Sequence, residues 1–129
     1  MKRRVSVPIR FNDIDAMGHV NNAVFLTYFE EARILFFQEH VGKDWDWQKH
    51  GIILARNEVD YLHPVLHTDS MEIDVIIKDV GTKSIRVEYE VWTKDTRLCA
   101  KGASVLVTYD HTIGRTVPVP ETWREVLLP

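Results

Sequence analysis

The segment at residues 22–40, NAVFLTYFEEARILFFQEH, constrains the fold more than any other part of the sequence. On a helix, the polar positions Thr27, Glu30, Glu31 and Gln38 cluster on one side, and most other positions are apolar. A flat sheet covers only one side of such a helix. We therefore expect one long helix that is enclosed by a curved sheet or by a second subunit. Asn21 or Asn22 is expected to cap its start, and Gly42 suits its end.

The remaining segments have the composition of β-strands. Apolar and charged residues alternate most clearly at 71–79 and 84–93. Strands are also expected at 5–11, 52–62 and 98–109, the first at a sheet edge because Pro8 lacks an amide proton. Pro120 favours a short helix near the C-terminal end. The order of strand, helix and four strands predicts an α+β fold in one domain over residues 1–129, with strand edges that favour symmetric pairing of copies.

Charge and composition argue against several classes of protein. The net charge is −3 and the basic residues are scattered, so nucleic acid is not an expected partner. No stretch approaches the roughly 20 apolar residues that span a bilayer, so stable membrane insertion is not expected. The single cysteine, Cys99, and an N-terminal segment without the apolar core of a secretion signal predict a cytoplasmic location.

Polar groups gather directly before the apolar helix, in the stretch FNDIDAMGHVNN at residues 11–22. Asp13 and Asp15 precede a helix start, where unpaired amides and the helix dipole favour negative charge. One loop could thus supply a base or nucleophile together with amides that hold a polarised carbonyl oxygen. The structural alternative remains open, because paired acids also close turns, asparagines cap helices, and a loop histidine such as His19 is often only a hydrogen-bonding residue.

Other catalytic arrangements find no support in the sequence. No serine or cysteine lies in a nucleophile elbow, and the glycines are too dispersed for a phosphate loop. His63 and His67 are four residues apart, but Pro64 and the β-type surroundings argue against a zinc-binding helix. We therefore expect no metal and no cofactor.

The stretch FNDIDAMGHVNNAVFLTYFEEAR resembles the signature of hotdog-fold thioesterases of the 4-hydroxybenzoyl-CoA thioesterase type, including acyl-CoA thioesterases linked to Tol-Pal genes and to long-chain fatty acids. VDYLHPV, GTKSIRVEYEV and AKGASVLVTYD extend the resemblance over nearly the whole chain. It implies a central helix wrapped by a curved antiparallel sheet of about five strands, and copies that join as a homodimer or homotetramer with active sites at the interface.

The resemblance also implies roles for individual residues. Asp15 matches the catalytic carboxylate, acting as nucleophile or general base, with Asp13 as its structural neighbour. An amide among Val20, Asn21 and Asn22 would hold the carbonyl oxygen. His19 matches a histidine of plant acyl-carrier-protein thioesterases, but Met17 replaces their asparagine, which leaves His19 a candidate for orientation or proton transfer. Basic residues considered for the CoA phosphates are Arg56, Lys83, Arg97 and Lys101.

The sequence therefore predicts an acyl-CoA thioesterase that releases a fatty or aromatic acid and CoA. The aromatic residues of the helix, among them Phe25, Phe29, Phe36 and Phe37, would line an acyl tunnel unless they only form the core. Two alternatives stay open: a thioesterase for acyl carrier protein, and a hotdog module that binds a thioester or a protein without hydrolysis.

Overall fold

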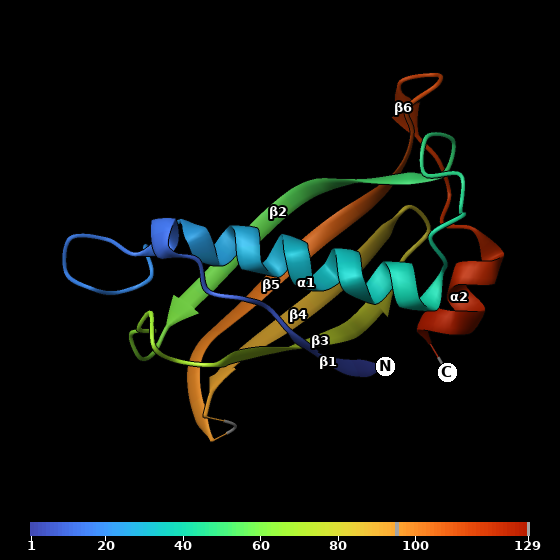
Figure 1. The fold of residues 1–129 in the computed structure, drawn as a ribbon. Helices are drawn as coiled ribbons and strands as arrows, with labels where there is room; N and C mark the ends of the chain where they lie inside the picture. The colour runs from blue at the N-terminus through green and yellow to red at the C-terminus, as the bar shows by residue number, and fades with distance from the viewer. Residues whose placement is uncertain (95, 129) are drawn as a thin grey trace.

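Helix α1 (Val24–His40) lies across the concave face of one curved antiparallel sheet (Figure 1). The computed structural model describes residues 1–94 and 96–128. The strands are β1 (Lys2–Ser6), β2 (Gly51–Tyr61), β3 (Met71–Val80), β4 (Ser84–Thr93), β5 (Arg97–Asp110) and the two-residue β6 (Arg115–Thr116). Their order is β1-β3-β4-β5-β2, with β6 paired to β5 beside this path. The predicted α+β arrangement of one long helix wrapped by an antiparallel sheet is confirmed.

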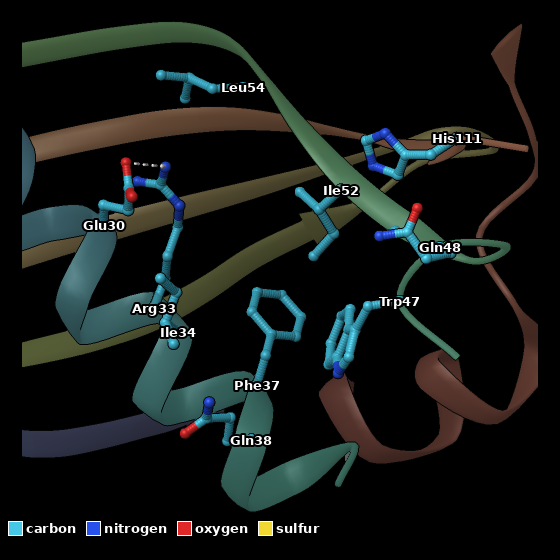
Figure 2. Close-up of a pocket in the computed structure, with 11 residues that line it drawn as sticks. Glu30, Arg33, Ile34, Phe37, Gln38, Trp47, Gln48, Ile52, Leu54 and His111 are labelled. Carbon is cyan, nitrogen blue, oxygen red and sulfur yellow. Dashed lines mark ion pairs between the residues drawn. The ribbon is translucent and has the colours of Figure 1, made fainter. Parts of the chain in front are cut away.

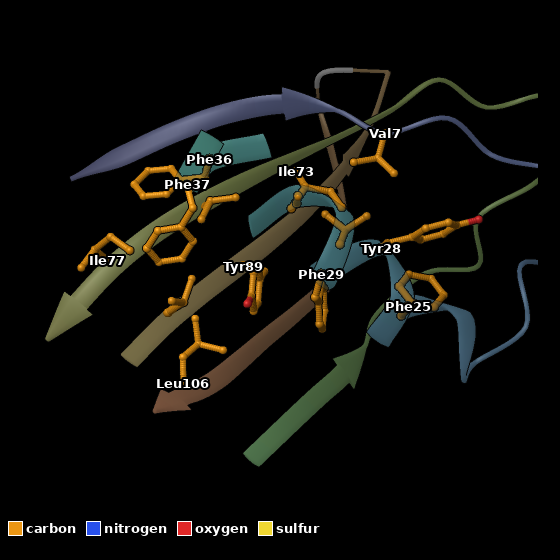
Figure 3. Packing of buried hydrophobic residues seen from close by; sticks show 14 of the residues in the cluster. Val7, Phe25, Tyr28, Phe29, Phe36, Phe37, Ile73, Ile77, Tyr89 and Leu106 are labelled. Atoms are coloured by element: carbon orange, nitrogen blue, oxygen red, sulfur yellow. The ribbon is translucent and has the colours of Figure 1, made fainter. Parts of the chain in front are cut away.

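The core forms where the apolar face of the sheet meets α1 (Figure 3). The ring of Phe29 stacks on that of Tyr89 from β4, with centroids 4.4 Å apart and planes 4° apart. Close to the end of α1, Trp123 from α2 (Glu121–Leu127) packs on the rings of Phe37, Trp45 and Trp47. The helix is thus covered on the side that faces the sheet, where its aromatic residues join the core: Phe25, Phe29, Phe36 and Phe37 are each at most 3% exposed. On its other side, Ile34 and Leu35 are exposed.

The N-terminal strand differs from its prediction at residues 5–11. It ends at Ser6, and the chain then forms a short 3-10 helix, η1 (Phe11–Asp13). Pro8 cannot donate to a strand ladder, and the Asp13 carboxylate accepts a hydrogen bond from the Arg10 amide at 3.0 Å, which folds the chain back. The strand β6 was not predicted, because two residues are too few to show alternation.

Of the two predictions about the ends of α1, one is wrong and the other is confirmed. Ala23 occupies the N-cap position without a side-chain hydrogen bond, so the prediction of Asn21 or Asn22 as the cap is wrong. Asn21 instead closes the preceding turn, since its Oδ1 accepts from the Ala23 amide at 2.9 Å. Gly42 ends the helix as expected, with φ +116° and its amide bonded to the Phe37 carbonyl. No helix in the described part of the chain combines the length and hydropathy needed to cross a membrane.

Candidate active site

The loop at residues 14–20 projects beyond the start of α1 and is closed by its own backbone (Figure 1). Ile14 and Val20 form a β-bridge, and the Asp15 amide donates to the His19 carbonyl at 2.7 Å. Gly18 makes the reversal possible, since its φ of +83° lies in the left-handed region that favours glycine. A second bridge, from His19 to Leu66, ties the loop to the segment that follows β2. Asp15 therefore sits on an ordered backbone.

The carboxylate of Asp15 is held by one oxygen only. Its Oδ1 accepts hydrogen bonds from the amides of Met17 at 2.9 Å and His19 at 3.2 Å. Its Oδ2 makes no hydrogen bond to any residue that the structure describes, and the residue is partly exposed. The loop amides fix the orientation of the group, which leaves the second oxygen free for chemistry on a bound molecule.

Asp13 has the opposite environment. It is buried, and its Oδ2 accepts hydrogen bonds from the Tyr28 hydroxyl at 2.6 Å and the Arg10 amide. Burial of the Tyr28 phenol, with the hydrogen bond to Asp13, raises its pKa above the ordinary range, so that it stays a donor. The Asp13 carbonyl also accepts from the Asn21 amide at 2.8 Å. These contacts attach the loop to α1 and keep Asp13 buried.

The three amides predicted to hold a carbonyl oxygen are not equivalent. The Val20 amide donates to the Val65 carbonyl and the Asn21 amide to the Asp13 carbonyl, both at 2.8 Å. The amides of Val20 and Asn21 are therefore already used within the chain. The Asn22 amide has no acceptor among the described residues. It directly precedes the first turn of α1, where the helix dipole adds positive potential.

His19 stands beside Asp15 through its backbone. Its amide donates to Asp15 Oδ1 and its carbonyl accepts from the Asp15 amide. Its imidazole is half-buried and makes no hydrogen bond within the described part of the chain. The backbone of His19 therefore has an evident part in shaping the loop, while its ring is available for a partner from outside.

A cavity of about 530 Å³ lies between α1 and the edge strand β2 (Figure 2). Phe37, Ile52 and Trp47 give it an apolar wall, and Glu30 and Arg33 form an ion pair at its other side, 3.9 Å apart. Arg33 is only 8% exposed. The cavity adjoins the beginning of β2 at Gly51, whereas the Asp15 loop lies near the end of that strand at Tyr61, whose hydroxyl contacts Asn22. Within one chain, the cavity and Asp15 are therefore well separated.

The family model of the thioesterase-like superfamily matches residues 9–127. The chain belongs to this superfamily. The protein YsmA of Bacillus subtilis is 30% identical over 122 residues, which cover 95% of this chain and 82% of YsmA. A crystal structure of a Thermus thermophilus thioesterase complexed with coenzyme A and zinc is 44% identical, with TM-score 0.85 and coverage of 98% and 97% of the two chains. A 1,4-dihydroxy-2-naphthoyl-CoA thioesterase from Synechocystis, 16% identical with TM-score 0.87 and coverage of 98% and 96%, shares the fold.

The protein is thus a hotdog-fold thioester hydrolase, as its sequence predicted. The structure does not gather the basic residues considered for CoA at one place on this thioesterase. Arg56 pairs with Glu58 on the face of the sheet away from α1. Lys83 and Arg97 flank opposite ends of β4, whose 10 residues span about 30 Å. These two cannot contact the same end of one CoA molecule within a single chain.

Two features of this thioesterase were not predicted from the sequence. One is the cavity beside β2, and the other is Tyr61, whose hydroxyl reaches the Asn22 carbonyl at 2.6 Å. Both arise between segments far apart in the chain, so no local pattern marks them; the resemblance at VDYLHPV contained Tyr61 but gave it no role. Within residues 1–94 and 96–128, no cluster of three or more His, Cys, Asp or Glu side chains is placed to share a metal ion.

Proposed function

We propose that this thioesterase hydrolyses acyl-CoA, with Asp15 as the reacting carboxylate. The observation that carries the proposal is that, among the described residues, one oxygen of Asp15 accepts no hydrogen bond and the Asn22 amide has no acceptor, both in the segment of the chain that leads into α1. The coenzyme A in the Thermus thermophilus relative, at 44% identity, supports CoA as the carrier. The substrate proposed is a fatty or aromatic acyl-CoA, and the products are the free acid and CoA.

Asp15 can act by two routes. In the first, its Oδ2 attacks the thioester carbon, the carbon–sulfur bond breaks, the thiolate leaves as CoA, and water then hydrolyses the mixed anhydride. In the second, Asp15 takes a proton from water, which attacks the same carbon and releases the thiol. In both routes the carbonyl oxygen gains negative charge, and the Asn22 amide at the start of α1 donates to it. We assign His19 a supporting role in orientation or proton transfer, since its amide holds Asp15 Oδ1.

The working form that we propose is a homodimer, alone or within a homotetramer. The strand β2 is an edge of the sheet, and antiparallel pairing with a second β2 would set its Tyr61 end against the partner's Gly51 end. The Asp15 loop of one copy would then face the cavity of the other, whose volume of about 530 Å³ is large enough for an acyl group. We also propose that residues 1–129 form one domain and act in the cytoplasm, where the free thiol of buried Cys99 would persist.

The experiment is a panel of acyl-CoA thioesters, of increasing chain length and with aromatic acyl groups, assayed by release of the CoA thiol. Asp15→Asn removes the nucleophile or base and is expected to lower kcat at least about a hundredfold. Asp44→Asn is the control, because Asp44 is an exposed acid between α1 and β2 that forms no ion pair with the described residues. A folded Asp15→Asn variant with full activity would contradict the role of Asp15. If thioesters of acyl carrier protein are hydrolysed and CoA thioesters are not, the substrate is an acyl carrier protein thioester instead of acyl-CoA. If neither is hydrolysed, the protein is a module that binds without hydrolysis.

A further inference from the structure

Tyr61 is the last residue of β2, yet it contacts the turn before α1. Its hydroxyl donates a hydrogen bond of 2.6 Å to the carbonyl of Asn22, 39 residues away in sequence. Its ring packs edge-to-face on Phe25, with centroids 5.2 Å apart. Burial raises the pKa of the Tyr61 phenol, so that it remains a protonated donor at neutral pH. The contact with Phe25 is sufficient to pack the ring. Because the residue is 45% exposed, water can reach the hydroxyl, so burial alone does not require its bond to Asn22.

The peptide groups around Asn22 show what this bond does. The amide of Asn22 and the carbonyl of Asn21 belong to one planar, trans peptide group, so they point in opposite directions. That carbonyl accepts from the Val24 amide at 3.0 Å in the turn entering the helix, which directs the Asn22 amide away from α1. On the N-terminal side of this peptide group, the Asn21 amide donates to the Asp13 carbonyl. On the C-terminal side, the Asn22 carbonyl accepts, among the described residues, only from the Phe25 amide at 3.4 Å and from the Tyr61 hydroxyl.

We propose that Tyr61 is a positioning residue for thioester hydrolysis, because its hydroxyl holds the Asn22 carbonyl and thereby the direction of the neighbouring Asn22 amide. The inference rests on the proposed function, in which that amide receives the carbonyl oxygen. Of the two bonds on the C-terminal side, the bond from Tyr61 is the shorter and connects the turn to the sheet. Without it, the Asn22 peptide retains its place in the chain but gains freedom to rotate away from the reacting oxygen.

The kinetic test compares Tyr61→Phe, which keeps the ring on Phe25, with Tyr109→Phe. The Tyr109 hydroxyl makes no hydrogen bond to the described residues and lies at the other end of the sheet, beside Gly51. The substrate is the acyl-CoA that the unmodified protein hydrolyses fastest. Tyr61→Phe is expected to lower kcat roughly tenfold with KM unchanged, less than the 10²–10³ lost when an oxyanion donor is removed outright. Tyr109→Phe should leave both constants unchanged.

A binding test isolates the carbonyl oxygen from folding and from CoA affinity. Two analogues of the same substrate are titrated: a thioether that lacks the carbonyl, and a difluoroketone in which CF2 replaces sulfur and whose carbonyl readily becomes tetrahedral, so that its oxygen resembles that of the transition state. Tyr61→Phe should bind the thioether as tightly as the unmodified protein does, but the ketone roughly tenfold more weakly. Equal loss for both analogues would indicate a general structural role and overturn the inference.

The outcomes separate this inference from the proposed function. If the unmodified protein hydrolyses acyl-CoA and Tyr61→Phe matches it in kcat and in ketone binding, the positioning role is wrong and the proposed function stands. If the unmodified protein neither hydrolyses nor binds any acyl-CoA, both are wrong. A fall in kcat together with selective loss of ketone binding supports both.

Discussion

Asp13 and Asp15 show how two identical side chains, two residues apart, acquire different properties from their surroundings. The carboxylate of Asp13 is buried under a tyrosine hydroxyl and a backbone amide, which use it to attach the loop to α1. The carboxylate of Asp15 is held by loop amides through one oxygen, and its other oxygen makes no hydrogen bond to the described residues. A buried acid that is bonded to a neighbouring side chain contributes to folding, whereas an oriented and partly exposed acid with a free oxygen is suited to react.

The amide of Asn22 can be tested separately from its side chain. Asn22→Pro deletes the amide proton, and it removes no hydrogen bond between described residues, because the Asn22 amide has no acceptor among them. We expect it to lower kcat about a hundredfold, as loss of an oxyanion donor does. Asn22→Ala keeps the amide and should stay within about twofold of the unmodified protein. Circular dichroism and a melting curve check that both variants fold, and equal activity of the two would mean that this amide does not receive the oxygen.

Asp74 gives a prediction about pH at the residue scale. Its carboxylate is 1% exposed and accepts from Arg4 at 2.8 and 3.0 Å and from the Trp92 indole at 3.1 Å. The Arg4 guanidinium lowers the pKa of this carboxyl, against the opposing effect of burial. The folded pKa is thus below that of an unfolded aspartate, about 3.9. The resulting stabilisation is fully present above that value and is lost as the pH falls through the folded pKa.

Asp74→Asn should therefore lower the free energy of unfolding by about 2 kcal/mol at pH 7. Urea unfolding curves between pH 7 and pH 3 measure the difference from the unmodified protein, and this difference should shrink below about pH 4. Asp79→Asn, on the exposed part of β3, is the control and should change little at any pH. A difference that does not depend on pH would show that shape, rather than charge, makes Asp74 stabilising.

At the scale of elements, the contact of α1 with the sheet depends on a glycine in β5. A Cβ added to Gly102 would lie 2.5 Å from Phe29 Cζ and 3.0 Å from the Glu58 carbonyl oxygen. Gly102→Ala must therefore displace the ring that stacks on Tyr89, and we expect a loss of about 1–3 kcal/mol of stability. Chemical denaturation measures it. Lys101→Ala, at the exposed neighbouring position, should change the stability by less than about 0.5 kcal/mol.

The sequence predicted those elements whose pattern is repeated many times. α1, β3, β4 and β5 were found because burial imposes a period on long segments, and the Asp15 loop because its residues resemble a family signature. Local evidence was insufficient elsewhere. The strand expected at 5–11 ends at Ser6, and its local pattern did not show that the Arg10 amide would bind the Asp13 side chain. The roles of Tyr61 and Asn22 depend on which amides are already bonded, and those bonds join the loop to Val65, Asp13 and β2, which only the folded chain brings together.

At the scale of the whole molecule, the edge strand β2 is the exposed feature that most calls for a partner. It has 11 residues, lies at the end of the sheet path, and carries exposed Ile53 and Leu54. Long apolar edge strands pair readily with other strands, so a soluble chain must cover or pair them. Symmetric pairing through β2 would satisfy this need and would also bring the Asp15 loop of one copy to the cavity of the other, which one chain alone keeps apart.

This arrangement predicts complementation between two inactive variants. Asp15→Asn removes the reacting carboxylate, and Ile34→Trp fills the mouth of the cavity from an exposed position on α1. Each homodimer should be nearly inactive. If the variants are unfolded together and refolded as an equimolar mixture, half of the dimers are mixed, and each of these has one intact site of two, so about a quarter of the original activity should return. A site built within one chain would restore none, because each chain would carry its own defect. Different affinity tags on the two variants, captured one after the other, establish that mixed dimers have formed, which makes the absence of restored activity decisive against the shared site.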